Sequence, residues 1–145
     1  MKIIVEGPDG AGKTTLVNAL VKKSNLNKVV FTKEGYKNFN SYMSYKNIDN
    51  VVFDRCFLSE VIYQNVFKRD RVLNIHEEYA LLENYFDDTI LIILNADLDT
   101  LKKRLEIRGD EEESVIDQLN IIKNLYDNYS KYLRVPTFNI ENINA

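Results

Sequence analysis

The sequence has one cysteine, Cys56, and one histidine, His76, among 145 residues. A single cysteine excludes a disulfide within the chain, and the scarcity of both residue types excludes a structural zinc site made from them. No run approaches the roughly 18 apolar residues that a membrane-spanning helix needs. Any metal is therefore expected on carboxylate, hydroxyl and phosphate oxygens, and we expect no membrane association.

An excess of basic residues is also missing, because the formal net charge is −3 and the sequence pI is about 5.3. A broad nucleic-acid surface needs clustered lysine and arginine, so we expect no nucleic-acid partner and a small anion bound locally. The length and a hydrophobic content of 45% fit one compact domain over residues 1–145. We expect no signal peptide, because a functional motif occupies the N-terminal residues, and hence a cytoplasmic protein.

That motif is residues 7–14, GPDGAGKT, which fits G-x-x-x-x-G-K-[ST] at every fixed position. A short apolar run with β-branched residues, 2–6, precedes it, and apolar residues at helical spacing follow it over 15–21. The order of strand, glycine-rich turn and helix is the setting that a phosphate-binding loop requires.

The chemistry of such a loop accounts for its residues. Glycines let successive backbone N–H groups point at a polyphosphate, and the following helix adds the positive end of its dipole. Lys13 is expected to reach the β- and γ-phosphates of ATP, and the Thr14 hydroxyl to bind Mg²⁺. The residues expected at the ATP phosphates are Gly10, Ala11, Gly12, Lys13, Thr14 and Thr15.

Strand and helix patterns alternate along the rest of the chain. Strands are predicted at 2–6, 28–32, 51–53, 89–94 and 137–140, and helices from the loop to about 24, at 57–67, at 75–86 after an Asn74–Glu77 cap, after Asp97, and from Ser114 with Asp117 to about 133. The pattern predicts an α/β protein with a doubly wound, five-stranded parallel sheet and helices on both faces. Ligands of such sheets bind outside the carboxyl ends of the strands, where Asp9, Lys33, Glu34, Asp54 and Arg55 are predicted to lie.

A second motif separates the classes of phosphate-loop protein. Residues 54–64, DRCFLSEVIYQ, resemble the D-R-[YS]-x-x-S-x-x-A-Y-Q run of thymidylate kinases, and residues 5–15, VEGPDGAGKTT, resemble the start of that family. Weaker similarity follows at 31–35 and at 101–109, where Arg104 and Arg108 match the entry to the family's lid. The resemblance therefore indicates a shortened thymidylate kinase-like nucleotide kinase, a P-loop fold with a short lid at about 108–114.

The chain also departs from that family. No arginine lies between Lys13 and Arg55, so the family's thymine-reading arginine has no counterpart there. Lys33 stands where the family has arginine, and the proline that follows Glu34 in the family's pattern is missing. The nucleobase preference is therefore left open.

The resemblance and the charges of the residues give candidate roles. Asp54 would hold Mg²⁺ directly or through water, and Arg55 would clamp the acceptor phosphate, unless the two are a helix cap and a solvated cation. Arg104 and Arg108, one helical turn apart, would reach the transferring phosphoryl group when the lid closes, unless both pair with nearby glutamates. Asp9 would accept a hydrogen bond from the 3′-hydroxyl of the sugar, unless it only forms the turn after Pro8.

Further substrate contacts are assigned to Lys33, Glu34 and Tyr63. Phe39, Tyr42 and Tyr45 are candidates to stack on the base, although aromatic residues at this spacing are more often part of a core.

Three hypotheses remain open. The first is an ATP- and Mg²⁺-dependent kinase of deoxynucleoside monophosphates, with dTMP as acceptor. The second is a deoxynucleoside kinase that phosphorylates a 5′-hydroxyl, with Glu34 as the base. The third is a non-catalytic nucleotide-binding module, although Asn95-Ala96-Asp97 does not fit the base-reading N-K-x-D of GTPases. A homodimer is left open as one form of assembly.

Overall fold

The computed structural model describes residues 1–30, 38–68, 71–109, 116–133 and 137–141. Five strands form one sheet in the order β2-β3-β1-β4-β5, and every neighbouring pair is parallel. The strands are β1 (Lys2–Glu6), β2 (Asn27–Val30), β3 (Val51–Asp54), β4 (Ile90–Asn95) and β5 (Thr137–Glu141). The predicted doubly wound, five-stranded parallel sheet is confirmed.

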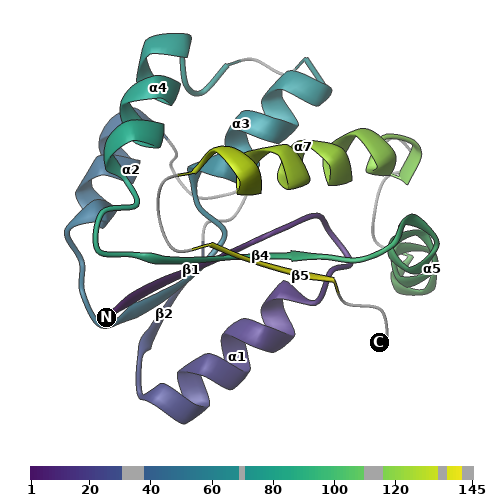
Figure 1. The fold of residues 1–145 in the computed structure, drawn as a ribbon, viewed down its shortest axis with the longest axis horizontal. Coiled ribbons are helices and arrows are strands. Elements are labelled where there is room, and N and C mark those ends of the chain that lie inside the picture. Colours follow the sequence, from purple (N-terminus) through teal and green to yellow (C-terminus); the bar gives the residue numbers. More distant parts are fainter. Residues whose placement is uncertain (31–37, 69–70, 110–115, 134–136, 142–145) are drawn as a thin grey trace.

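Helices cover both faces of this sheet. Figure 1 shows α1 on one face and α2, α3, α4 and α7 on the other, with α5 beyond the end of β4. The helices span Lys13–Ser24 (α1), Phe39–Lys46 (α2), Phe57–Val66 (α3), Ile75–Asn84 (α4), Leu98–Arg108 (α5) and Leu119–Tyr132 (α7). Since the strands run in one direction, the β1–α1 and β3–α3 connections meet at one end of the sheet, where a ligand is expected.

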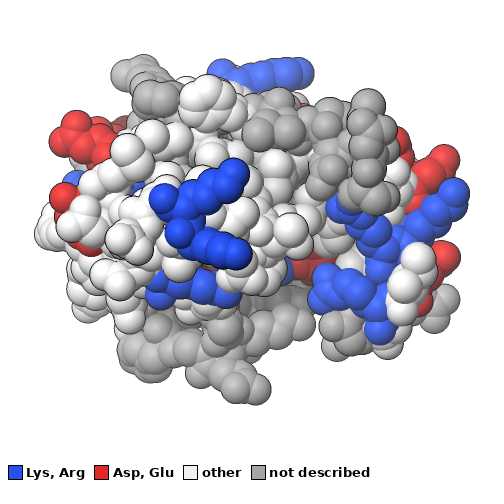
Figure 2. Space-filling view, turned by 90° about the horizontal axis from the view of Figure 1, so that it is seen from below, with Lys and Arg blue, Asp and Glu red and all other residues white. Residues whose placement is uncertain are grey.

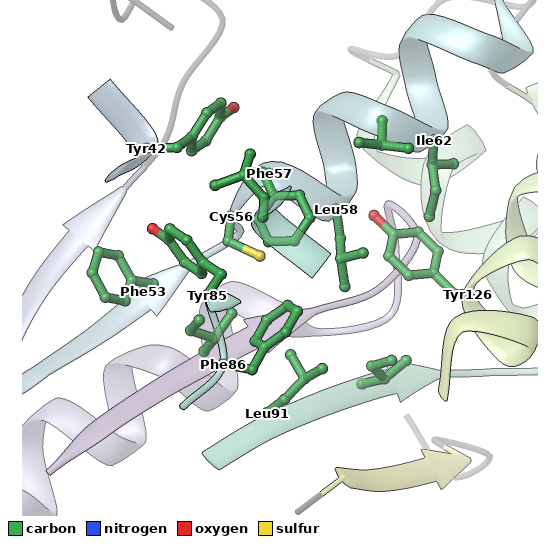
Figure 3. Packing of buried hydrophobic residues seen from close by; sticks show 14 of the residues in the cluster. Tyr42, Phe53, Cys56, Phe57, Leu58, Ile62, Tyr85, Phe86, Leu91 and Tyr126 are labelled. Atoms are coloured by element: carbon green, nitrogen blue, oxygen red, sulfur yellow. The ribbon is translucent and has the colours of Figure 1, made fainter. Parts of the chain in front are cut away.

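Two hydrophobic clusters hold the layers together. The larger one lies under α3, α4 and α7 and is rich in aromatic rings. In it the ring of Phe57 meets Tyr85 edge-on at 5.2 Å between centroids and lies 5.4 Å from Phe86 (Figure 3). The smaller cluster joins α1 and α5 to the other face through aliphatic side chains such as Val17 and Leu101. Burial of these rings and aliphatic chains is the main source of stability.

Local signals fix several helix ends. The predicted cap at Asn74 is confirmed, because its side chain accepts a hydrogen bond from the N–H of Glu77 at 2.9 Å while the Glu77 side chain accepts one from the N–H of Asn74 at 3.0 Å. Asp97 caps α5 in a similar way, accepting a bond from the N–H of Thr100. A second reciprocal cap, between Asn38 and Ser41, begins α2 and was missed by the sequence analysis.

Two boundaries differ from the expectation. The last long helix, α7, begins at Leu119, after two helical residues at 116–117 and a turn at 118, and the predicted start at Ser114 lies outside the described residues. β2 begins one residue early, at Asn27, and its predicted end at Thr32 lies outside the described residues. Among the described residues, no helix is both long enough and apolar enough to cross a membrane.

Candidate active site

The phosphate loop joins β1 to α1 and is built on glycines whose backbone other residues rarely adopt. Gly10 and Gly12 have φ values of 89° and 94°. A Cβ at Gly7 would stand 2.1 Å from the carbonyl oxygen of Leu94, at the end of the neighbouring strand. The loop can therefore lie close against β4 only with glycine at this position.

Lys13 opens α1 and points back across the loop. Its Nζ donates to the carbonyl oxygen of Pro8 at 2.9 Å and lies 3.9 Å from a carboxylate oxygen of Asp9. Burial, followed by the charge of Arg55, lowers the pKa of Lys13 to about 8. The ammonium is thus held inside the curve of the loop, where a phosphate chain would meet it.

Thr14 and Asp54 provide oxygen atoms suited to a hard cation. The Thr14 hydroxyl donates to Oδ2 of Asp54 at 3.2 Å, which brings together the first turn of α1 and the end of β3. No group of three or more His, Cys, Asp or Glu side chains suited to a metal occurs within the described ranges. The pair fits Mg²⁺ in the manner of phosphate-loop proteins, in which phosphate and water oxygens complete the shell.

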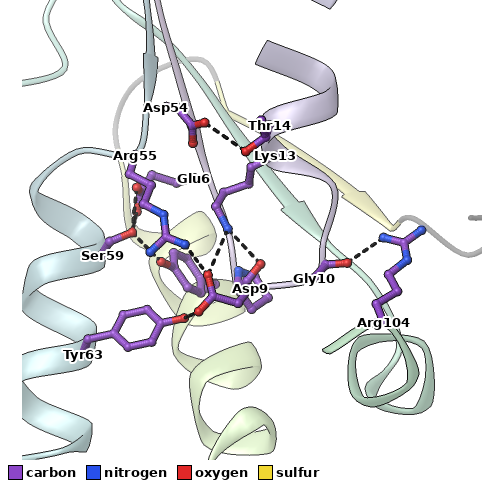
Figure 4. A network of polar contacts seen from close by, with 12 residues as sticks. Glu6, Asp9, Gly10, Lys13, Thr14, Asp54, Arg55, Ser59, Tyr63 and Arg104 are labelled. Atoms are coloured by element: carbon purple, nitrogen blue, oxygen red, sulfur yellow. Dashed lines mark hydrogen bonds and ion pairs between the residues drawn. The ribbon is translucent and has the colours of Figure 1, made fainter. Parts of the chain in front are cut away.

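Asp9 is the centre of a second group of side chains. Its carboxylate pairs with the guanidinium of Arg55 and accepts a hydrogen bond from the Tyr63 hydroxyl at 3.2 Å (Figure 4). Burial works to raise the pKa of Asp9, but the charges of Arg55 and Lys13 outweigh it and hold that pKa below its usual value. The three predicted residues Asp9, Arg55 and Tyr63 therefore lie together, beside Lys13.

Glu6 was not singled out by the sequence analysis, yet it is fully buried below this group. Its carboxylate accepts hydrogen bonds from the N–H of Cys56 at 2.8 Å and from the Ser59 hydroxyl at 2.9 and 3.0 Å. The Ser59 hydroxyl is also 2.9 Å from the Tyr126 hydroxyl on α7. Burial raises the pKa of Glu6 to about 7 against the opposing effect of the Cys56 N–H. A carboxylate that directly follows the apolar residues 3–5 of a buried strand was the signal that could have identified it.

The two arginines of α5 differ in their surroundings. Arg104 donates from Nη1 to the carbonyl oxygen of Gly10 at 2.6 Å, so it binds the phosphate loop from outside. Arg108 is exposed in the last residue of the helix, before Gly109. In Figure 2 lysines and arginines gather on the side where α5 lies in Figure 1, and the exposed Lys102 and Lys103 belong to this helix.

The aromatic candidates for base stacking are divided by their burial. Tyr42 has no exposed surface and packs in the larger core against Phe57, so the stacking hypothesis is wrong for it. Tyr45 contacts Phe53 edge-on. Phe39 is half-buried against the same core, and its assignment to the substrate stays a prediction. Lys33 and Glu34 lie outside the described residues, as does most of the predicted lid at 108–114.

Asn95 is the last residue of β4, Asp97 lies just after it, and both serve the fold. The Asn95 amide donates to Asp127 on α7 at 2.8 Å, and its oxygen accepts from the N–H of Ala96. Asp97 is occupied by its cap on α5. Both ends of the nearest match to a guanine-reading motif thus have structural partners.

Comparison with known proteins agrees with the class that these features define, a phosphate-loop protein with the fold of small-molecule kinases. A family model described as AAA domain matches residues 3–123. The chain therefore belongs to this family of phosphate-loop proteins.

Two curated relatives are similar in sequence. The SPbeta prophage-derived uncharacterized protein YorR of Bacillus subtilis is 30% identical over 115 residues, which cover 75% of this chain and 70% of that protein. A protein of Acidianus bottle-shaped virus named "Putative thymidylate kinase" is 24% identical over 150 residues, covering 93% of this chain and 87% of that one.

Solved structures extend the comparison. The crystal structure of YorR from B. subtilis, in complex with phosphorylated GDP, superposes with a TM-score of 0.81 at 27% identity, covering 97% of this chain and 85% of that one. Deoxyadenosine kinase from M. mycoides, with the products dCMP and dCDP, gives a TM-score of 0.65 at 23% identity over 97% and 90% of the two chains. The second likeness confirms the kinase-type fold.

Proposed function

We propose that this protein transfers the γ-phosphoryl group of ATP to a deoxynucleoside monophosphate, with dTMP as the first acceptor to test. The observation that carries the proposal is the meeting of two cations, Lys13 and Arg55, at one end of the sheet. Phosphoryl transfer between two anions depends on positioning and on neutralising charge. A monophosphate acceptor needs that second cation, and a free nucleoside does not.

The donor half rests on the phosphate loop. The backbone N–H groups of residues 10–15 are assigned to the phosphates of ATP, with Lys13 at the β- and γ-phosphates. Thr14 and Asp54, 3.2 Å apart, would hold Mg²⁺. The metal would lower the negative charge of the phosphates, and these two side chains would fix its place.

The acceptor half rests on Asp9, Arg55 and Tyr63. Arg55 is assigned to the acceptor phosphate, which its guanidinium can bind through two parallel hydrogen bonds. In the structure this guanidinium pairs with Asp9. Arrival of an acceptor would exchange that carboxylate for phosphate and leave Asp9 to accept a hydrogen bond from the sugar 3′-hydroxyl.

Of the two lid candidates, we assign the catalytic cation to Arg108 and an anchoring role to Arg104. Arg104 already donates to the Gly10 carbonyl, a contact that holds α5 on the loop. Arg108 is exposed at the end of α5, where the chain enters residues 108–114. A cation at that point can approach a transferring phosphoryl group when the lid closes.

The acceptor base is the least constrained part of the proposal. A viral relative carries the name of a thymidylate kinase, which supports dTMP, and the B. subtilis relative was solved with phosphorylated GDP, which makes guanine nucleotides the first competitors. An ADP-release assay should therefore compare all four deoxynucleoside monophosphates, GMP and the free deoxynucleosides, with ATP and Mg²⁺.

Each outcome of that assay has a meaning. Fastest turnover with dTMP supports the proposal in full, and fastest turnover with another monophosphate keeps the reaction and corrects the base. Turnover confined to free deoxynucleosides would replace it with the 5′-hydroxyl kinase, and Glu34→Gln should then abolish activity. Nucleotide binding without turnover of any acceptor would favour a regulatory module.

A further inference from the structure

The turn that carries Arg55 has an unusual backbone. Arg55 adopts a φ of 73°, in the left-handed region that side chains other than glycine rarely occupy. Such a conformation costs on the order of 1 kcal/mol or more, so surrounding contacts must hold it. Arg55 stands in the short turn between Asp54, the last residue of β3, and α3, which begins at Phe57.

Two consecutive residues of β1 hold the turn on its two sides. The N–H of Arg55 donates to the carbonyl oxygen of Val5 at 2.9 Å. The next N–H, that of Cys56, donates to the Glu6 carboxylate at 2.8 Å. The peptide groups before and after the Arg55 Cα are therefore both attached to the central strand, and Glu6 supplies one of them with its side chain.

Glu6 also caps α3 from another element. Cys56 occupies the N-cap position and makes no side-chain cap bond, and Ser59 lies three residues later. In a capping box, a carboxylate at that later position reaches back to the N-cap N–H. Here Glu6 of β1 takes that part, accepting from both the Cys56 N–H and the Ser59 hydroxyl. A carboxylate at a helix N-terminus is also favoured by the helix dipole.

The network extends to a third element. The Ser59 hydroxyl contacts the Tyr126 hydroxyl, so β1, α3 and α7 meet at one buried group of oxygens (Figure 4 shows Glu6 and Ser59 next to Arg55). All of these partners are buried: Glu6, Cys56, Ser59 and Tyr126 have exposed fractions between 0% and 7%. Their hydrogen bonds join β1, α3 and α7 and do not end on the phosphate loop, although the charges of Glu6 and Lys13 act on each other.

We propose that Glu6 is a positioning residue for Arg55: by holding the Cys56 N–H and the Ser59 hydroxyl, it fixes the turn from which Arg55 reaches the acceptor phosphate. The expected effect on the acceptor KM rests on the proposed function. The placement of Arg55 by Glu6 does not depend on any reaction. Glu6 contacts neither substrate nor metal in this scheme and acts only through the turn.

The kinetic test compares Glu6→Ala with Glu6→Gln. Glutamine keeps an oxygen for the Cys56 N–H, so Glu6→Gln should retain the acceptor KM within about threefold, whereas Glu6→Ala should raise it at least about tenfold. The KM for ATP should stay within about twofold in both variants, because the phosphate loop keeps its own backbone geometry. An equal rise in both KM values for Glu6→Ala would overturn the proposal.

A double-mutant cycle separates positioning from general damage. If Glu6 acts through Arg55, the double variant Glu6→Ala/Arg55→Ala should have an acceptor KM less than about twofold above that of Arg55→Ala alone. If Glu6→Ala raised the acceptor KM by the same factor with and without Arg55, the positioning role would be overturned. Ser59→Ala is the milder variant should Glu6→Ala fold poorly, with the same expected pattern at smaller size. Gln64→Ala is the matched control, because Gln64 is equally buried on α3 but bonds the backbone of Val72 and Leu73. It should lower stability and leave the acceptor KM unchanged.

An activity-independent measurement keeps the two proposals apart. In the wild type and in Glu6→Gln, the chemical shift of the Arg55 side-chain ¹⁵N–¹H signal should differ from that of a solvated arginine. In Glu6→Ala, it should move to the value of a solvated arginine. Loss of phosphotransfer with every acceptor, together with this pattern, would refute the proposed function and support the positioning role. An unchanged Arg55 signal in Glu6→Ala would refute the positioning role, whatever the enzyme does.

Discussion

The donor and acceptor halves of the site are built in different ways. The donor half is local in sequence, since one loop and the first turn of α1 supply nearly all of it, with Asp54 at the end of β3 and Arg104 on α5 as distant partners. The acceptor half draws on β1, the loop, the turn after β3, α3 and α7, with contacts between residues 46 to 67 positions apart. A local site can be recognised from a short motif, whereas a dispersed one exists only when the sheet has formed.

Substitution at Lys13 should have the largest effect and should be confined to the donor half. Lys13→Met removes the cation expected at the β- and γ-phosphates, so turnover should fall by at least about 1,000-fold. The free energy of unfolding at neutral pH should rise by on the order of 1 kcal/mol, because burial lowers the pKa of Lys13 from 10.5 to about 8 and thus penalises its charged form. That penalty is complete below about pH 8 and disappears as the pH rises to 10.5.

Assay and urea unfolding of the same preparation test both statements. Lys22→Met, at an exposed lysine on the same helix, is the control and should change neither quantity. Wild-type-like turnover in Lys13→Met would remove the phosphate-loop assignment.

Substitution at Arg108 tests whether the end of α5 supplies a cation to the phosphoryl group as it passes from the donor half to the acceptor half. Arg108→Ala should lower kcat by about 100-fold with little change in the acceptor KM, as expected for a cation that acts on transition-state charge. Lys102→Ala removes an exposed cation from the same helix and should have no such effect. A kcat within a few-fold of wild type in Arg108→Ala, with a large loss in Arg104→Ala, would exchange the roles of the two arginines.

A smaller effect is expected at Asp9, on the acceptor side. Asp9→Ala should lower kcat/KM about tenfold more with 2′-deoxynucleotides than with their 2′,3′-dideoxy analogues, because only the former lose a hydrogen bond from the 3′-hydroxyl. Tyr63→Phe removes the hydroxyl that donates to Asp9 and should affect both substrates alike. Equal losses for both substrates in Asp9→Ala would mean that Asp9 holds the loop and does not bind the sugar.

The smallest expected effect concerns stability and arises from Glu6. Because its folded pKa of about 7 lies above the ordinary 4.5, folding takes up a proton between these values, so this residue's contribution to stability is lost as the pH rises from 4.5 to about 7. Glu6→Gln mimics the protonated form. The difference in free energy of unfolding between this variant and the wild type should therefore grow in favour of the variant by on the order of 1–3 kcal/mol from pH 4.5 to about 7. Urea unfolding at several pH values measures the difference, and parallel pH curves for the two proteins would contradict it.

The sequence predicted the donor half of the site more completely than the acceptor half. The motif at residues 7–14 and the apolar strands led directly to the sheet, to Lys13 and to the Thr14–Asp54 pair. The resemblance and the rule for strand ends placed Asp9 and Arg55 at the same edge of the sheet and assigned Tyr63 to the substrate, but they did not predict the bonds among these three side chains. Glu6 was missed because its partners are a backbone N–H and hydroxyls on two later helices, which no spacing in the sequence brings together. Tyr42 lies in the core, as aromatic residues at this spacing more often do, but its place in a polar stretch of the sequence does not reveal which way its ring points.

The lone cysteine, Cys56, lies in the turn that carries Arg55 and can report chemically on whether that turn is closed. Cys56 is 1% exposed and its pKa lies well above the ordinary value because of its burial, so its thiol cannot react while the turn is closed. Alkylation of this protein must therefore proceed through opening of the N-terminal end of α3, and its rate measures how often the segment beside Arg55 comes apart. An acceptor bound to Arg55 would slow that labelling, and ATP bound to the loop alone would slow it far less.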